Sequence, residues 1–152
     1  MTEFNTIDDV LAFAIKDEQR ASDLYAGLAT RSRNKEIQKV FEQFSKEELG
    51  HKKRLEAIKS GRVSAVSPKK VQDLKIGDYM VEVDTSRDDL NYQEALIVAM
   101  KEEKAAFRLY SDLAAQADHA GLKETFLQLA QEEAKHKLRF EIEYDDYVLK
   151  EN

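Results

Sequence analysis

The chain has 152 residues, a formal net charge of −6 and no cysteine. This length suits one domain with a buried core, and the missing cysteines exclude disulfides, thiolate zinc sites and iron–sulfur clusters from these residues. The negative charge argues against sequence-independent binding of nucleic acid. The sequence shows neither a basic-then-apolar signal pattern nor an apolar run of membrane-spanning length, so we expect a cytoplasmic protein without a membrane partner.

Composition and capping residues predict long helices, starting with an antiparallel hairpin. Charged residues make up 36% of the sequence, against only five glycines and one proline, which is typical of solvated helices. Thr6 can cap a first helix, and Ser32 or Asn34 can open a second helix that ends near Ser60. The short turn between them predicts a helical hairpin over 6–60.

The last third of the sequence predicts a second hairpin. Asn91, with Glu94 three residues later, forms a capping-box start for a third helix. Asp118 or His119 can cap a fourth helix, and we interpret His119 as a cap rather than a metal ligand. The turn is again short, so the second hairpin is expected over 91–150.

The segment between the hairpins, 62–90, has a different character. It contains Pro68, Gly77 and a short alternating stretch at 79–83. A helix of about 26 residues is ~39 Å long, and extended chain covers ~3.3 Å per residue, so this connector can run the full length of the bundle. We therefore predict an all-α antiparallel four-helix bundle with one long crossover between helices two and three, forming a single domain over 1–152. Two separate hairpins on a linker are the alternative, but a lone hairpin could not cover its apolar face.

An internal repeat relates the two hairpins. Residues 14–25 (AIKDEQRASDLY) match 99–110 (AMKEEKAAFRLY), and residues 41–56 (FEQFSKEELGHKKRLE) match 126–141 (FLQLAQEEAKHKLRFE). Both matches share one offset of 85 residues without a gap. The chain thus consists of two copies of a helical hairpin joined by a dissimilar connector.

Each predicted helix has an apolar stripe that is interrupted by a glutamate at its middle. The stripes follow a 4-3-4-3 spacing, which is the pattern of a face that packs into a bundle core. In helices two and four, a histidine follows the glutamate by three residues, on the same face. The six residues are Glu18, Glu48, His51, Glu103, Glu133 and His136. In each hairpin the two glutamates lie fifteen residues on either side of the turn, so we expect all four at one level.

Four carboxylates at one level of an apolar core require compensation, because an unpaired buried charge is costly. Two divalent cations would neutralise four glutamates, and two neutral histidines would complete the set. Ala21 and Ala106, one turn beyond Glu18 and Glu103, would leave room for the ions and a small ligand. Oxygen-rich ligation with two imidazoles favours iron or manganese, and zinc could also bind. A salt-bridged polar layer without metal is the alternative.

Two tyrosines and four further acids lie near the six residues in the sequence or on the same helix face. Tyr25 and Tyr110, seven residues after Glu18 and Glu103, could donate hydrogen bonds to these carboxylates, or could direct their hydroxyls toward water or backbone. We expect the four acids that directly precede the glutamates to face solvent. They are Asp17, Glu47, Glu102 and Glu132.

These residues resemble the diiron domain of rubrerythrins, within the ferritin-like superfamily. The resemblance covers nearly the whole chain and rests on Glu18, Glu48-Leu49-Gly50-His51, Glu103 and Glu133-Ala134-Lys135-His136. It implies two iron ions in a non-haem centre that reduces hydrogen peroxide, or uses oxygen to oxidise ferrous iron, in a homodimer. It also implies that Glu18 and Glu103 bind one metal each, that Glu48 and Glu133 bridge, and that each histidine completes one metal.

The sequence departs from the family pattern in two respects. Typical rubrerythrins carry a rubredoxin domain with a four-cysteine iron, whereas this chain lacks cysteine, so we expect electrons from an external donor protein. Many rubrerythrins also have a glutamate where this chain has Ala106, which resembles symmetric ferroxidase centres more closely. Two alternatives therefore remain: an iron-handling ferroxidase, and a non-catalytic helical interaction module.

Overall fold

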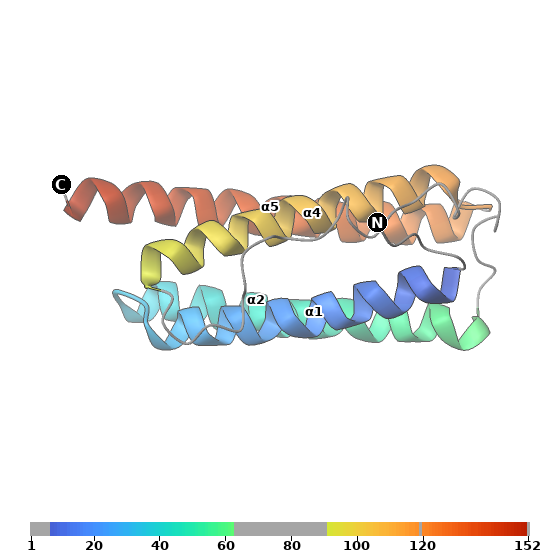
Figure 1. Cartoon of the computed structure of the whole chain (residues 1–152), viewed down its shortest axis with the longest axis horizontal. Coiled ribbons are helices and arrows are strands. Elements are labelled where there is room, and N and C mark those ends of the chain that lie inside the picture. Colours follow the sequence, from blue (N-terminus) through green and yellow to red (C-terminus); the bar gives the residue numbers. More distant parts are fainter. Residues whose placement is uncertain (1–6, 63–90, 119, 152) are drawn as a thin grey trace.

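The computed structural model describes residues 7–62, 91–118 and 120–151, which form helices joined by short turns (Figure 1). The helices are α1 (Ile7–Thr30), α2 (Lys35–Ala57), the short π-helical segment η1 (Ile58–Arg62) that continues α2, α4 (Tyr92–Gln116) and α5 (Ala120–Glu151). The described residues contain no strand. None of the described helices is long and apolar enough to cross a membrane.

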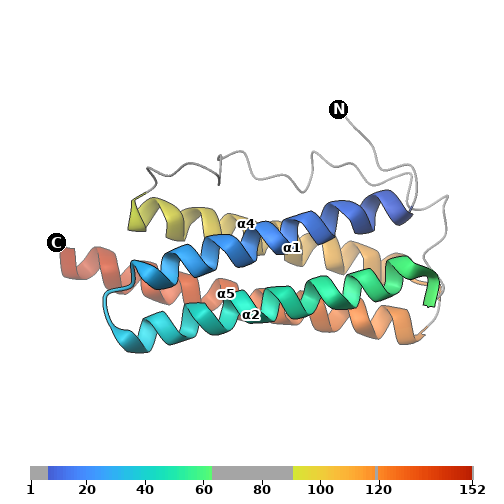
Figure 2. The ribbon, with the colours of Figure 1, turned by 90° about the horizontal axis from the view of Figure 1, so that it is seen from below.

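The helices form the predicted four-helix bundle. Figures 1 and 2 show α1 antiparallel to α2, and α4 antiparallel to α5. The end of α2 and the start of α4 lie at opposite ends of the bundle, so that α4 runs parallel to α2 (Figure 1). This arrangement confirms the parallel direction of helices two and three that the long crossover predicts. The crossover itself, 63–90, lies outside the described residues.

Side chains satisfy the free backbone groups at two helix starts. The Asn34 side chain accepts a hydrogen bond from the amide of Ile37 at 2.9 Å, which makes Asn34 the cap of α2. Asn91 and Glu94 form the predicted capping box of α4, with bonds of 2.7 and 3.1 Å. Both confirm the predicted positions. Of the remaining predicted caps, Thr6 and His119 lie outside the described residues, and Asp118 lies two residues before the start of α5.

Two apolar clusters fill the bundle on either side of its middle. One includes Leu11, Leu55, Leu113, Leu122, Phe126 and Leu129. The other includes Tyr25, Leu28, Phe41, Leu96 and Phe140. Burying one large apolar side chain contributes about 1.5–3 kcal/mol, so the clusters can hold the helices around a middle layer whose acids oppose folding.

An ion pair between the partly exposed Arg33 and the buried Glu143 stabilises the end of the bundle where α1 turns into α2. Arg33, in the turn, binds both carboxylate oxygens of Glu143 in α5, at 2.6 and 3.0 Å. The hydroxyl of Tyr92, at the start of α4, donates to Glu143 Oε2 at 2.7 Å. Glu143 therefore joins three segments of the chain. The sequence patterns did not predict this contact.

Candidate metal centre

The six predicted ligands converge at the middle of the bundle, between the two apolar clusters. Every helix contributes: Glu18 from α1, Glu48 and His51 from α2, Glu103 from α4, and Glu133 and His136 from α5. Each of the six is at most 2% exposed to solvent. The apolar stripes explain this placement, because packing them against one another turns the interrupting residues inward as well.

The six residues form two overlapping groups, each with three carboxylates and one imidazole. The first group is Glu18, Glu48, His51 and Glu133, and the second is Glu48, Glu103, Glu133 and His136. Within each group the potential ligand atoms lie within 4.8 Å of one another. Glu48 and Glu133 belong to both groups, so these two carboxylates could bridge two ions. The 85-residue repeat relates the two groups, because each residue of one group has its repeat equivalent in the other group.

Both histidines direct Nδ1 into the centre. His51 Nδ1 lies 3.0 Å from Glu18 Oε2 and 2.7 Å from Glu133 Oε1. His136 Nδ1 lies 2.8 Å from Glu48 Oε1 and 3.6 Å from Glu103 Oε1. The two rings are nearly parallel, with centroids 6.3 Å apart. Each imidazole can therefore offer one nitrogen to a metal ion at its end of the centre.

Two buried tyrosines donate to the centre across the hairpins. Tyr110 Oη donates to Glu18 Oε1 at 3.0 Å, and Tyr25 Oη donates to Glu103 Oε1. Of the two orientations that the sequence left open, the structure has the hydroxyls on the carboxylates. Each hydrogen bond leaves the second oxygen of its glutamate free to face the middle of the centre.

Two acids that we expected to face solvent, Glu47 and Glu132, are 34% and 30% exposed and also contact the two central histidines. His51 Nε2 lies 3.1 Å from Glu132 Oε1, and His136 Nε2 lies 2.8 Å from Glu47 Oε1. Ionised carboxylates only accept hydrogen bonds, so we assign a hydrogen to each Nε2. Such contacts fix the ring orientation of a metal-binding histidine. Both acids thus face solvent in part, and they reach the facing helix because a glutamate side chain is long.

The other two acids lie on the side of the bundle where α1 meets α4, and Arg20 binds both. Arg20 Nη2 is 2.8 Å from Asp17 Oδ1 and 3.2 Å from Glu102 Oε1. Glu102 is only 5% exposed, so the solvent-facing prediction is wrong for this residue. Burial raises the pKa of Asp17 to about 6 and that of Glu102 to about 7, against the lowering effect of Arg20.

Electrostatics show that the layer cannot hold four free carboxylates. Burial, followed by repulsion from Glu133, raises the pKa of Glu18 to about 7, and the same causes raise the pKa of Glu48 and Glu103 well above the usual value. Burial would also raise the pKa of Glu133, but its contact with His51 outweighs this effect and lowers it. Burial would lower the pKa of His51, yet the carboxylates of Glu133 and Glu18 raise it to about 11. Protons therefore balance these charges, and cations could replace the protons.

Unpaired buried atoms show that the residues fit a metal ion. Both carboxylate oxygens of Glu48, one oxygen of each other core glutamate and Nδ1 of both histidines have no hydrogen-bond partner outside this layer among the described residues. Buried polar atoms are rarely left without a partner. These orphaned atoms gather in one layer and belong to residue types that bind iron or manganese. The donor set thus suits a pair of divalent cations.

The fold and these six residues define the class of the protein. A four-helix bundle with one glutamate on each of two helices and Glu-x-x-His on each of the other two is the arrangement of ferritin-like carboxylate proteins with two metals. The family model described as Rubrerythrin matches residues 9–147. The chain therefore belongs to the rubrerythrin family.

A solved structure supports the fold. A Thermotoga maritima protein described as ferritin-like and diiron-carboxylate superposes with a TM-score of 0.78 and 22% sequence identity, covering 97% of this chain and 99% of the other. At this identity the likeness establishes the fold alone. A search of curated proteins found no significant match.

Proposed function

We propose that the chain is a non-haem diiron oxidoreductase that reduces hydrogen peroxide with electrons from a separate donor protein. The observation that carries this proposal is the pair of overlapping groups, each with three carboxylates and one imidazole, that share Glu48 and Glu133. Glu18 and His51 would hold one iron, and Glu103 and His136 the other. Two ferrous ions, when bound, would supply the two electrons that cleavage of the peroxide O–O bond consumes.

The chain's own residues would prepare the site for this reaction. The apolar clusters pack on both sides of the layer, and each of its six central residues is at most 2% exposed. The Tyr110 hydroxyl donates a hydrogen bond to Glu18, and the Tyr25 hydroxyl donates one to Glu103. These bonds would fix the orientation of the two carboxylates that each bind one iron. Ala21 has no side chain beyond Cβ to fill the space beside Glu18, which favours access of a small ligand such as peroxide. Reduction of one peroxide to two waters takes up two electrons and two protons.

Titration of the ferrous protein with peroxide tests the activity. We expect anaerobically purified protein to hold two irons per chain, and one peroxide per two irons to complete the oxidation. An added electron donor should then restore the ferrous state and allow turnover. Glu48→Ala and Glu133→Ala should abolish both metal loading and turnover, whereas Glu56→Ala, at an exposed position of α2, should change neither. Full metal content and turnover in the first two variants would contradict the proposal.

A ferroxidase is the second candidate, and Ala106 favours it. Without a further glutamate at this position, the centre is symmetric in its ligand types. A ferroxidase would be oxidised by oxygen at least as fast as by peroxide and would release ferric iron. Stopped-flow oxidation with each oxidant separates the two candidates. Native mass spectrometry tests the homodimer that we propose for either function.

A further inference from the structure

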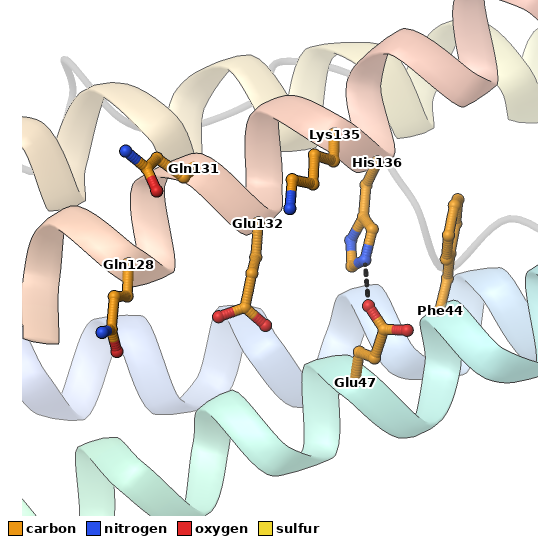
Figure 3. Close-up of a pocket in the computed structure, with 7 residues that line it drawn as sticks. All are labelled: Phe44, Glu47, Gln128, Gln131, Glu132, Lys135 and His136. Atoms are coloured by element: carbon orange, nitrogen blue, oxygen red, sulfur yellow. Dashed lines mark hydrogen bonds and ion pairs between the residues drawn. The ribbon is translucent and has the colours of Figure 1, made fainter.

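The two histidines of the centre are each held from outside by a carboxylate of the opposite hairpin. His51 Nε2 donates to Glu132 at 3.1 Å, and His136 Nε2 donates to Glu47 at 2.8 Å. Figure 3 shows the Glu47–His136 pair at a pocket between α2 and α5. A carboxylate on the outer nitrogen raises the basicity of the nitrogen that faces the metal. Glu47 and Glu132 are thus positioning residues, which act through the histidines.

The two pairs differ by one charge. Arg54 Nη2 lies 3.2 Å from Glu132 Oε2 and forms an ion pair with it. The repeat places Arg139 at the position equivalent to Arg54. Among the described residues Arg139 makes no such pair with Glu47, and its Nε is buried without a hydrogen-bond partner. The second oxygen of Glu47 instead accepts from the neutral amide of Gln43 at 3.1 Å.

The solvent exposure of the two carboxylates and the pocket that they line do not distinguish the two pairs. Glu47 is 34% exposed and Glu132 is 30% exposed, and both line one pocket of about 470 Å³. Lys135 also lines this pocket, and among the residues drawn in Figure 3 it forms no ion pair with either carboxylate. On the far side of the centre, Arg20 contacts one acid from each hairpin. The pairs also differ in one uncharged contact, since the Phe44 ring stacks on His136 with centroids 4.1 Å apart and the repeat equivalent of Phe44 is a leucine. Arg54 is therefore the charged group that distinguishes the pairs.

A guanidinium bound to a carboxylate offsets part of its negative charge, so that the carboxylate polarises the imidazole less. We propose that the two metal positions are unequal: the position at His136 binds a divalent cation more tightly than the position at His51, because Arg54 offsets the charge of Glu132 whereas Glu47 forms no ion pair with an arginine or lysine among the described residues. This inference rests on the proposed metal centre.

Stepwise titration of the metal-free chain with Co²⁺ tests the inequality, by calorimetry and by the visible absorption of the bound ion. We expect two resolved steps of one ion each. Glu47→Gln should weaken the tighter step by about 10- to 100-fold, and Glu132→Gln should weaken the other step instead. Arg54→Gln should strengthen the weaker step and bring the two affinities together. Glutamine keeps an oxygen that accepts the histidine hydrogen, so these changes remove a charge and keep the contact.

Lys53→Gln is the matched control, since it removes one positive charge from the neighbouring exposed position of α2. It should leave both steps unchanged, and circular dichroism checks that every variant is folded. Two indistinguishable steps in the unchanged chain would overturn the inequality while leaving the metal centre intact. Equal effects of Lys53→Gln and Arg54→Gln would overturn it as well. No Co²⁺ binding at all would instead contradict the proposed function.

Discussion

Tyr110 in the second hairpin donates its hydroxyl to Glu18 in the first, and the distance between Tyr110 Oη and Glu18 Oε1 is 3.0 Å. Tyr25 donates in the opposite direction, to Glu103. Both tyrosines are at most 1% exposed. The two hairpins therefore exchange equivalent hydrogen bonds at the level of the centre, which links the fold of the bundle directly to the orientation of two proposed metal ligands.

Removing this hydroxyl should destabilise the bundle. Tyr110→Phe deletes a donor and leaves a buried carboxylate oxygen without a partner, so we expect a loss of about 1–3 kcal/mol in the free energy of unfolding. Urea denaturation of the metal-free protein measures it. Tyr144→Phe is the control, because the Tyr144 hydroxyl has no hydrogen bond to a described residue, and it should change stability little. Equal stability of Tyr110→Phe and the unchanged protein would contradict this role.

Removing Glu48, which belongs to both groups of potential ligands, should have the opposite effect on the metal-free protein. Glu48→Gln keeps the size of the side chain and eliminates a buried carboxyl group that burial and Glu133 destabilise. We expect a higher melting temperature in chelator at pH 8, together with loss of metal binding. Glu56→Gln, at an exposed position of the same helix, should alter neither. A lower melting temperature with unchanged metal affinity would show that the Glu48 carboxyl group neither destabilises the metal-free protein nor binds metal.

The stability of the metal-free protein should fall as the pH rises from 5 to 8. The pKa of Glu18 is about 7 in the folded chain, against 4.5 for an unperturbed glutamate side chain, so the folded state keeps a proton that the unfolded state loses above pH 4.5. The stabilisation is therefore complete below pH 4.5 and is lost as the pH passes 7. The pKa of His51, raised from 6.5 to about 11, contributes in the same direction above pH 6.5.

Melting temperatures between pH 5 and pH 8, with chelator and with saturating Mn²⁺, measure this dependence of stability on pH. Divalent cations displace the protons, so Mn²⁺ should stabilise the protein more at pH 8 than at pH 5. Glu18→Gln should flatten the slope between pH 4.5 and 7 in chelator. A melting temperature that rises with pH in chelator would refute the proposed protonation of the layer.

Arg33 should stabilise the fold without affecting the centre. Arg33→Met leaves Glu143 buried without its charged partner, and we expect a loss of about 3 kcal/mol. The double variant Arg33→Met/Glu143→Leu should recover most of this loss, because both charges are then removed. Denaturation gives the stability, and metal analysis should still find two ions per chain in both variants. Additive losses in the double variant would contradict a direct ion pair.

The hydrophobic pattern was sufficient to predict the helices and the convergence of the six central residues. The pattern indicates the direction in which a side chain leaves its helix. The 85-residue repeat indicates which residues of the two hairpins lie at the same level along the bundle. It does not report how far a side chain reaches. Glu47 and Glu132 leave their helices away from the apolar stripe, yet both bend back to a histidine on the facing helix. Their shared offset of 85 residues is the signal that could have identified them.

Other contacts depend on how closely the helices pack. Glu102 is buried although its repeat equivalent, Asp17, is 21% exposed, so position in the repeat does not determine burial. Glu143 lies beyond the last repeated segment and pairs with a residue of the first turn. No local pattern predicts a contact between residues that only the assembled bundle brings together.

Anomalous diffraction from crystals grown with ferrous iron tests the central claim most directly. We predict two iron peaks inside the bundle, one beside Glu18 and His51 and one beside Glu103 and His136, with Glu48 and Glu133 between them. A folded protein whose six central side chains surround no peak in excess iron would contradict it.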